Sequence, residues 1–306
     1  MVRLVSLLAL ACTALAVQAV QASESSSTPS PPTTANTFEV DFLHSGSPEL
    51  MPVDLSKGVV FFKALVNGQE VWILLDNGAA NTVIDTSLAE AVGSDLTVLQ
   101  NGIRAPSGQL ETRVARQINL NIPTQIEFTA DLYAVDFEPI SARIGRRIGL
   151  VLGNDVLSNL TYVVDPQFSR VLFVPSGTMN LSGGNIQNLT MVNGVIDTLV
   201  DGKPARLKLD LGSNHQLTIF EHSWENFFSD NVGVERTMSA DATGNVRASE
   251  VRQNTRLDVG RFSAIVRTTR LDHPDDSIDG HIGFPYFLDK LVVVDEAAGK
   301  LTIVQR

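Results

Sequence analysis

Cysteine is almost absent from this chain. Its single cysteine, Cys12, lies in an N-terminal apolar stretch that we expect to be removed, which would leave a mature chain without any. This excludes disulfides, catalytic thiols and cysteine-ligated metals as explanations of the fold or the function. A protein without such crosslinks needs a sizeable hydrophobic core, and about 280 residues are enough to build one.

Positive charge is also scarce. The chain has 23 Lys and Arg against 34 Asp and Glu, a net charge of −11. This balance argues against binding to nucleic acid or anionic membranes. The acidic residues are scattered, which is typical of a solvated surface. The sequence also lacks a His-Glu-x-x-His motif and a phosphate-binding glycine loop. The acidic and histidine residues between 272 and 281 are interpreted as a solvated loop, so no metal site and no cofactor are expected.

Long hydrophobic runs are missing as well. The apolar run Leu4–Ala16 is shorter than the roughly 20 residues that span a bilayer. With small residues after it, this run predicts a signal peptide over 1–22 and no stable membrane insertion. Lipid attachment at Cys12 is disfavoured because Ala9 stands where a leucine is usual. Residues 23–36 are rich in Ser, Thr and Pro, which predicts a disordered tether. We therefore expect export, to a bacterial periplasm or the extracellular space.

Two short stretches of the chain are similar to each other. Both have an apolar run that ends in aspartate, with glycine two residues later: Leu74-Leu75-Asp76-Asn77-Gly78-Ala79 and Leu207-Lys208-Leu209-Asp210-Leu211-Gly212-Ser213. The two aspartates are 210 − 76 = 134 residues apart. A carboxylate in this position is exposed where a strand turns sharply. Two copies indicate that two similar halves bring two carboxylates together.

The repeat continues downstream of both aspartates. Val151-Leu152-Gly153 corresponds to His281-Ile282-Gly283 at an offset of 283 − 153 = 130 residues. Tyr162–Asp165 corresponds to Val292–Asp295 at the same offset, since 295 − 165 = 130. A constant offset over this many positions indicates two related halves.

Most of the chain is predicted to form short strands. Between the repeated motifs, residues 104–109 and 240–245 form small, polar, glycine-containing tips that are typical of hairpins. Helical periodicity is weak and favours only short helices at Ser87–Val92 and Trp224–Phe228. We predict an all-β, two-lobed protein. Its ranges are 37–176 for the N-terminal lobe, 177–183 for the linker and 184–306 for the C-terminal lobe.

These motifs resemble the retropepsin-type aspartic proteases. In that family an apolar strand ends in Asp-Thr-Gly or Asp-Ser-Gly, a flap hairpin follows, and an apolar-apolar-Gly turn comes last. The three motifs occur in this order in both halves, over about 59–174 and 189–304. The resemblance implies two fused retropepsin-like units in a pepsin-like bilobal arrangement. A fused pair would complete its site within one chain, so a monomer is expected.

The resemblance also implies a function and a set of site residues. It makes Asp76 and Asp210 a catalytic pair that activates water for hydrolysis of peptide bonds. Gly108 and Gly244 would lie in flaps that close over an extended peptide substrate. The active-site loops would be formed by Asn77, Gly78, Leu211, Gly212 and Ser213. Ser213 offers a hydroxyl to the aspartate of its own lobe, whereas Ala79 does not.

The middle residue of each loop departs from the family pattern. A Thr or Ser hydroxyl there normally bonds across to the opposite lobe. Asn77 can still donate and accept a hydrogen bond, but Leu211 can do neither, so loss of this lock is expected. His281 stands where an aliphatic residue is usual, and either pairing with a carboxylate or simple packing is open. The leading hypothesis is an exported aspartic endopeptidase. The alternative is a catalytically impaired peptide-binding module on the same fold, and a glycosidase with paired carboxylates is less favoured.

Overall fold

The computed structural model describes residues 9–10, 39–43, 49–99, 103–105, 108–229, 234–240, 246–273 and 275–305. The expected tether at 23–36 lies outside these residues, as does the expected signal peptide apart from Ala9 and Leu10. Those two residues form strand β1 (Ala9–Leu10), which pairs in parallel with β19 (Val234–Ala240). The signal peptide and the tether stay predictions.

The first half of the chain forms a closed β-barrel. Its strands are connected in the order β11, β6, β12, β5, β4, β10, and β10 pairs back with β11. Short strands β2 (Asp41–Phe42) and β7 (Leu96–Val98) lie beside it. The barrel strands are β4 (Val60–Val66), β5 (Gln69–Leu75), β6 (Val83–Asp85), β10 (Arg113–Ile122), β11 (Ile126–Val135) and β12 (Leu150–Leu152).

The second half forms a barrel with the same connections. The order is β20, β16, β17, β22, β18, β21, and β21 pairs back with β20. The strands are β16 (Val195–Val200), β17 (Lys203–Asp210), β18 (Leu217–Phe220), β20 (Val246–Val259), β21 (Phe262–Leu271) and β22 (Gly280–Gly283). The prediction of an all-β, bilobal fold is confirmed.

The strand that carries each aspartate begins at the same kind of turn. Asn67-Gly68 joins β4 to β5, and Asp201-Gly202 joins β16 to β17. All four residues have positive φ, at 46° and 82° in the first turn and 46° and 80° in the second. Two-residue hairpin turns of this type match the natural twist of the flanking strands, and Asn, Asp and Gly adopt them most readily. These turns fix the register of β5 and β17, and hence where the two aspartates lie.

A third sheet joins the halves. Its order is β15, β24, β23, β13, β14, β3, so three strands of the C-terminal half lie beside three strands of the N-terminal half and the two sets meet where β23 pairs with β13. Val163 on β13 pairs with Val293 on β23, and 293 − 163 = 130 is also the offset of the sequence repeat. The approximate twofold axis therefore passes between equivalent residues. The strands are β3 (Met51–Pro52), β13 (Leu160–Asp165), β14 (Arg170–Pro175), β15 (Ile186–Thr190), β23 (Lys290–Asp295) and β24 (Lys300–Gln305).

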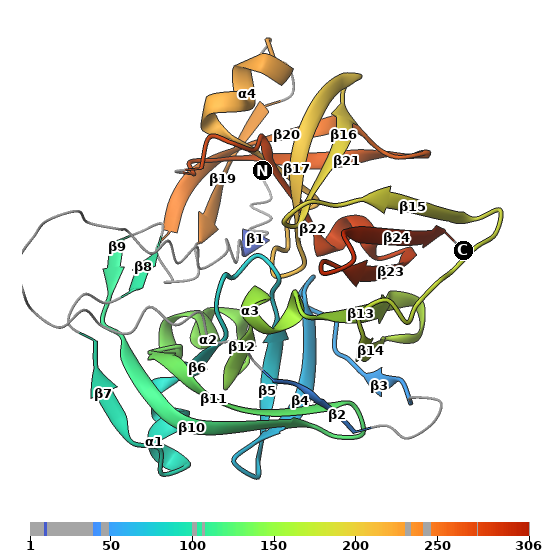
Figure 1. Ribbon diagram of the computed structural model, residues 1–306. Helices are drawn as coiled ribbons and strands as arrows, with labels where there is room; N and C mark the ends of the chain where they lie inside the picture. The colour runs from blue at the N-terminus through green and yellow to red at the C-terminus, as the bar shows by residue number, and fades with distance from the viewer. Residues whose placement is uncertain are drawn as a thin grey trace, which may run out of the picture.

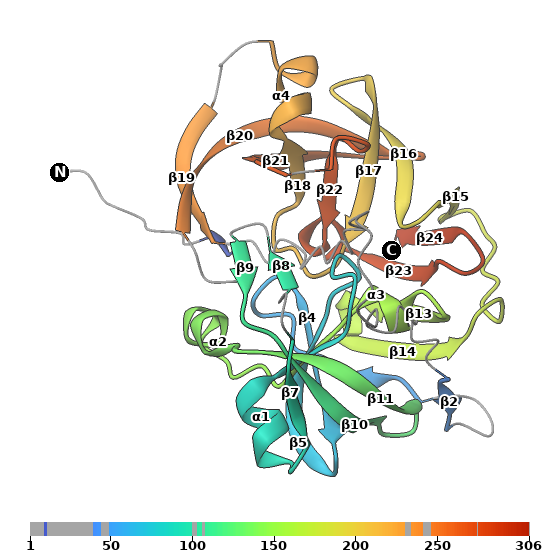
Figure 2. The same ribbon diagram turned by 60° about the vertical axis from the view of Figure 1, so that its left-hand side comes forward.

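The ribbon drawing shows how these three sheets are arranged. The N-terminal barrel, in blue and green, and the C-terminal barrel, in orange and red, stack one above the other, with the joining sheet on one side (Figure 1). The hairpin of β8 (Ile103–Ala105) and β9 (Gly108–Leu110) lies near β19, on the side away from that sheet, in this and the turned view (Figure 2). No strand is present between β14 and β15, where we placed the linker.

The helices are short and lie in the connections between strands. The two expected helices are present as α1 (Thr86–Ala91) and α4 (Glu221–Phe227). Helix α2 (Glu138–Ile144) was not expected. The other helical segments are α3 (Asn154–Leu157) and the 3-10 helices η1 (Pro166–Phe168) and η2 (Phe284–Phe287). In the part of the chain that the structure describes, no helix has the length and apolar character to cross a membrane.

Candidate active site

Asp76 immediately follows the buried end of β5. Ile73, Leu74 and Leu75 are fully or almost fully buried, and the Asp76 N–H donates to the Leu152 carbonyl of β12 at 3.1 Å. The chain then turns back, so that the N–H groups of Gly78 and Ala79 each donate to Asp76 Oδ1 at 3.0 Å. The carboxyl group is therefore oriented by its own loop, with Oδ1 already engaged and only Oδ2 left for other partners.

Asp210 is the last residue of β17 and is fully buried. Its loop has the same turn, because the Ser213 N–H donates to the Asp210 carbonyl at 3.2 Å as Ala79 N–H does to Asp76. The side chain has different surroundings. Among the described residues neither carboxylate oxygen has a hydrogen-bond partner, but Oδ2 lies 3.3 Å from His281 Nδ1, within ion-pair distance.

Ser213 does not bond to Asp210 as its sequence position suggested. Its hydroxyl oxygen instead accepts from the backbone N–H of His215 at 3.3 Å. The His215 ring Nδ1 in turn lies 3.0 Å from the Thr269 hydroxyl. Burial lowers the pKa of His215 to about 4, so its ring is neutral over most of the pH range. Ser213 therefore shapes the loop rather than supporting the carboxylate.

The two aspartates are brought together at the junction of the lobes. A Cβ atom on Gly212 would lie 2.2 Å from Asp76 Cγ and 2.3 and 2.5 Å from its two oxygens. The Asp76 carboxyl group thus packs directly on the backbone of the loop that follows Asp210. Burial, and then the charge of Asp210, raises the pKa of Asp76 to about 8. At neutral pH this raised pKa favours the protonated form of Asp76.

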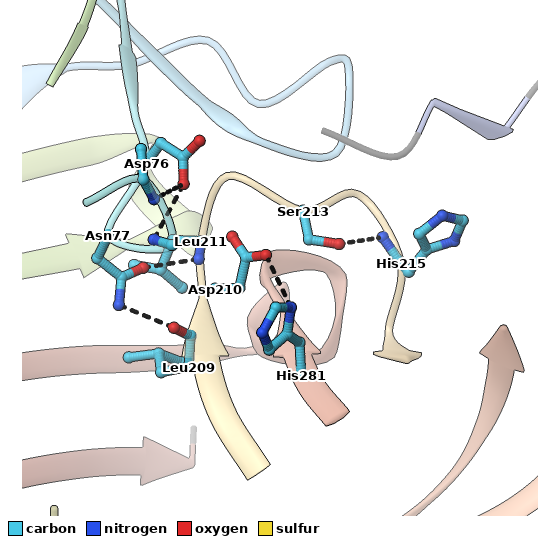
Figure 3. Close-up of polar contacts among 10 residues, drawn as sticks. Asp76, Asn77, Leu209, Asp210, Leu211, Ser213, His215 and His281 are labelled. Carbon is cyan, nitrogen blue, oxygen red and sulfur yellow. Dashed lines mark hydrogen bonds and ion pairs between the residues drawn. The ribbon is translucent and has the colours of Figure 1, made fainter. Parts of the chain in front are cut away.

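Asn77 makes the cross-lobe lock that we expected to be lost. Its Nδ2 donates to the Leu209 carbonyl at 3.0 Å, and its Oδ1 accepts from the Leu211 N–H at 2.8 Å (Figure 3). The expectation is wrong because an amide carries a donor and an acceptor on one side chain, and both reach the backbone on either side of Asp210. Leu211, fully buried, packs in the hydrophobic core instead. The lock is one-sided: the N-terminal loop provides it alone.

A half-buried carboxyl group near Asn77, that of Glu296, was missed in the sequence. Glu296 follows β23, and its Oε2 accepts from Asn154 Nδ2 at 3.1 Å. Burial raises the pKa of Glu296. Hydrogen bonds from Asn154 and Asn77 and the positive charge of Lys208 act in the opposite direction. The repeat partner of Glu296, at 296 − 130 = 166, is Pro166, so the repeat carried no signal for it.

Hairpins occur at both positions where we expected flaps, but the structure does not describe their tips. In the N-terminal lobe Gly108 pairs with Ala105 across the β8–β9 hairpin. In the C-terminal lobe Ala240 pairs with Val246 at the end of the β19–β20 hairpin. Gly244 lies outside the described residues. Among the described residues no cluster of three His, Cys, Asp or Glu side chains could hold a metal ion.

Comparison with known families gives one match. Residues 62–156 match the family described as aspartyl protease. The matched segment contains the Asp76 loop and the β12 turn at Gly153, but not Asp210. No curated protein matches the chain. The match supports a protease-type function for a fold that is consistent with bilobal aspartic proteases.

Proposed function

We propose that the protein is an aspartic endopeptidase that hydrolyses peptide bonds with water activated between Asp76 and Asp210. The observation that carries the proposal is the meeting of two buried carboxyl groups from equivalent strand ends, one of which retains its proton near neutrality. A pair that shares one proton contains a general acid and a general base at the same pH. The proposal includes the view that the second barrel is a second retropepsin-like unit fused to the first.

The surroundings of the two carboxyl groups assign their roles. Asp76 Oδ1 accepts two backbone N–H groups, so its proton resides on Oδ2. We assign Asp210, in contact with His281, the role of the general base. Asp210 removes a proton from the water, whose oxygen attacks the peptide carbonyl carbon. Asp76 donates its hydrogen to the carbonyl oxygen, and the departing nitrogen then receives a proton from the pair. This chemistry requires neither a cofactor nor a covalent intermediate.

The proposed substrate is an extended peptide or protein segment bound between the lobes. An extended chain adds backbone hydrogen bonds to flap hairpins such as β8–β9 and β19–β20. We further propose that the chain acts as a monomer after export to a bacterial periplasm or the extracellular space. The apolar run and small residues of 1–22 support export.

A peptide-library cleavage assay from acid to neutral pH tests the proposal. Asp76→Asn and Asp210→Asn should each lower kcat/KM by at least about a hundredfold, since each removes an acid–base group. Asp201→Asn is the matched control: it changes an exposed aspartate of the β16–β17 turn and should cleave like the parent. Parent-like cleavage by both dyad variants would overturn the assignment.

The alternative is a peptide-binding module without turnover. The observation that favours it is the buried Leu211, which cannot return the hydrogen bond that Asn77 makes across the junction. Peptides that bind to the parent chain without being cleaved at any pH would select this alternative. Glycoside hydrolysis has no comparable support.

A further inference from the structure

His281 lies directly behind the acid–base pair. It is on β22, the strand that runs parallel to β17 with His281 opposite Lys208. Side chains two residues apart on a strand share a face, so Asp210 and Lys208 lie on the same face as His281. The ring is almost completely buried, and its Nδ1 lies 3.3 Å from Asp210 Oδ2. The close-up shows the ring on the side of Asp210 away from Asp76 (Figure 3).

The aromatic neighbours of His281 fix the position of its ring. Phe220 meets it edge-on at a centroid distance of 4.8 Å, and His273 does so at 5.5 Å. Phe220 and His273 are themselves stacked at 4.2 Å with their planes 3° apart. Both neighbours belong to one stacked pair, so the His281 ring packs against that pair while its Nδ1 faces Asp210, and the contact is built into the fold of the C-terminal lobe.

The charged and titratable groups that face His281 come from three neighbouring segments. From β17 it faces Asp210 and Lys208, and from β18 its Cα partner is the uncharged Thr218. The 272–279 segment contributes His273, whose pKa is lowered to about 4 by burial and then by the charge of His281, with Asp275 opposing. Asp76 lies across the junction. A pKa of about 4 leaves the His273 ring neutral at neutral pH.

We propose that His281 is a positioning residue that keeps Asp210 ionised and so extends the active, singly protonated form of the dyad to lower pH. This inference rests on the proposed peptidase function. An imidazolium next to a buried carboxylate favours its ionised form, whereas without this cation burial favours the protonated form. Loss of activity on the acid side occurs when both carboxyl groups are protonated. A nearby cation therefore moves that loss to lower pH.

The first test is the pH profile of kcat/KM for three variants. His281→Leu should move the acid limb up by about one pH unit or more, because an opposite charge at this distance shifts a carboxyl group by that amount. At pH values below the acid limb, kcat/KM of His281→Leu should be about tenfold lower than that of the parent, and on the plateau above the limb the two values should agree within about threefold. His281→Asn keeps a polar group without the charge and should show a smaller shift. His273→Phe preserves the stack on Phe220 and should leave the limb in place.

The second test needs neither activity nor a variant at 281. The carboxyl carbon signals of Asp and the ring nitrogen signals of His281 are followed by NMR from pH 2 to 8, a range on the order of six units that covers ordinary carboxyl and imidazole titrations. The chemical shift of the His281 ring nitrogens should change at the pH where the dyad first titrates, and Asp210→Asn should abolish that change. Absence of cleavage with this coupling present would refute the peptidase but not the pairing. Two results would overturn the inference. One is cleavage by His281→Leu with its acid limb at the same pH as in the parent, and the other is a His281 signal that does not change when the dyad titrates.

Discussion

The loops that follow Asp76 and Asp210 have the same backbone turn, but their side chains interact with different partners. Both close with an N–H to aspartate carbonyl bond of 3.2 Å. In the N-terminal loop the carboxylate is held by two backbone N–H groups, and Asn77 reaches across to the other lobe. In the C-terminal loop the carboxylate has no hydrogen-bond partner among the described residues and lies 3.3 Å from the ring of His281, and the middle residue is apolar. The Asp76 loop therefore connects the two lobes, whereas the Asp210 carboxylate is placed against a histidine, so a repeated motif need not repeat its interactions.

The largest effect should come from closing the space that the C-terminal loop leaves for Asp76. Gly212→Ala places a Cβ within 2.5 Å of three Asp76 carboxyl atoms and must displace that group. Because displacements of about 1 Å cost roughly a hundredfold in rate, kcat/KM should fall at least that far. Steady-state kinetics checks this. Gly184→Ala, where a Cβ meets nothing within 4 Å, is the control. A Gly212→Ala enzyme with parent kinetics would mean that the loops are further apart than described.

An intermediate effect is expected from removing the one-sided lock. Asn77→Leu would make both loops apolar at the middle position and leave the Leu209 carbonyl and the Leu211 N–H buried without partners. Each unsatisfied group costs about 1–3 kcal/mol, so the free energy of unfolding should fall by about 2–5 kcal/mol in urea denaturation. Asn226→Leu, at an exposed position of α4, controls for loss of an amide and should cost less than about 1 kcal/mol. Equal losses in the two variants would show that Asn77 is not a special link.

The smallest effect is a dependence of stability on pH that belongs to Asp76. Its pKa is raised from 3.8 to about 8, so the folded state retains a proton that the unfolded state loses between these values. This contribution opposes folding increasingly as pH rises from about 4 to about 8. Asp76→Asn removes it, so the variant should match the parent near pH 4 and exceed its stability by more than about 1 kcal/mol at pH 8.

Thermal melts across this range, with exposed Asp197→Asn as the control for loss of one charge, check the prediction. A stability difference between Asp76→Asn and the parent that stays constant with pH would contradict the raised pKa of Asp76. It would also remove the reason for assigning the shared proton to that residue.

Much of the fold was predictable because the repeat acts at the level of strands. The Asp-x-Gly motifs and the apolar-apolar-Gly turns mark the ends of β5, β12, β17 and β22, and parallel pairing brings those ends together. Helix α2 had usable signals that were not weighed: a proline in its first turn, and Gly145 at its end with a φ of 70°.

The interactions of the site were less predictable because they depend on distances across the junction. Residue type showed that Asn77 can donate and accept, but not that both groups reach the backbone of β17 and its loop. For His281 the sequence left pairing and packing open, and the structure shows both. Glu296 has no counterpart in the first half, so only the fold reveals that its half-buried carboxyl group lies near Asn77.

The pairing of Val163 with Val293 also constrains how the lobes move. When the two lobes of a protein are joined only by a flexible linker, they can rotate apart freely. Here the halves share a continuous ladder of backbone hydrogen bonds, with β13 held between β14 and β23. Rotation of one lobe against the other must bend that ladder, and a bent sheet returns to its resting twist. The separation of the lobes should therefore change gradually, as the shared sheet bends when a ligand binds, instead of switching between one open and one closed state.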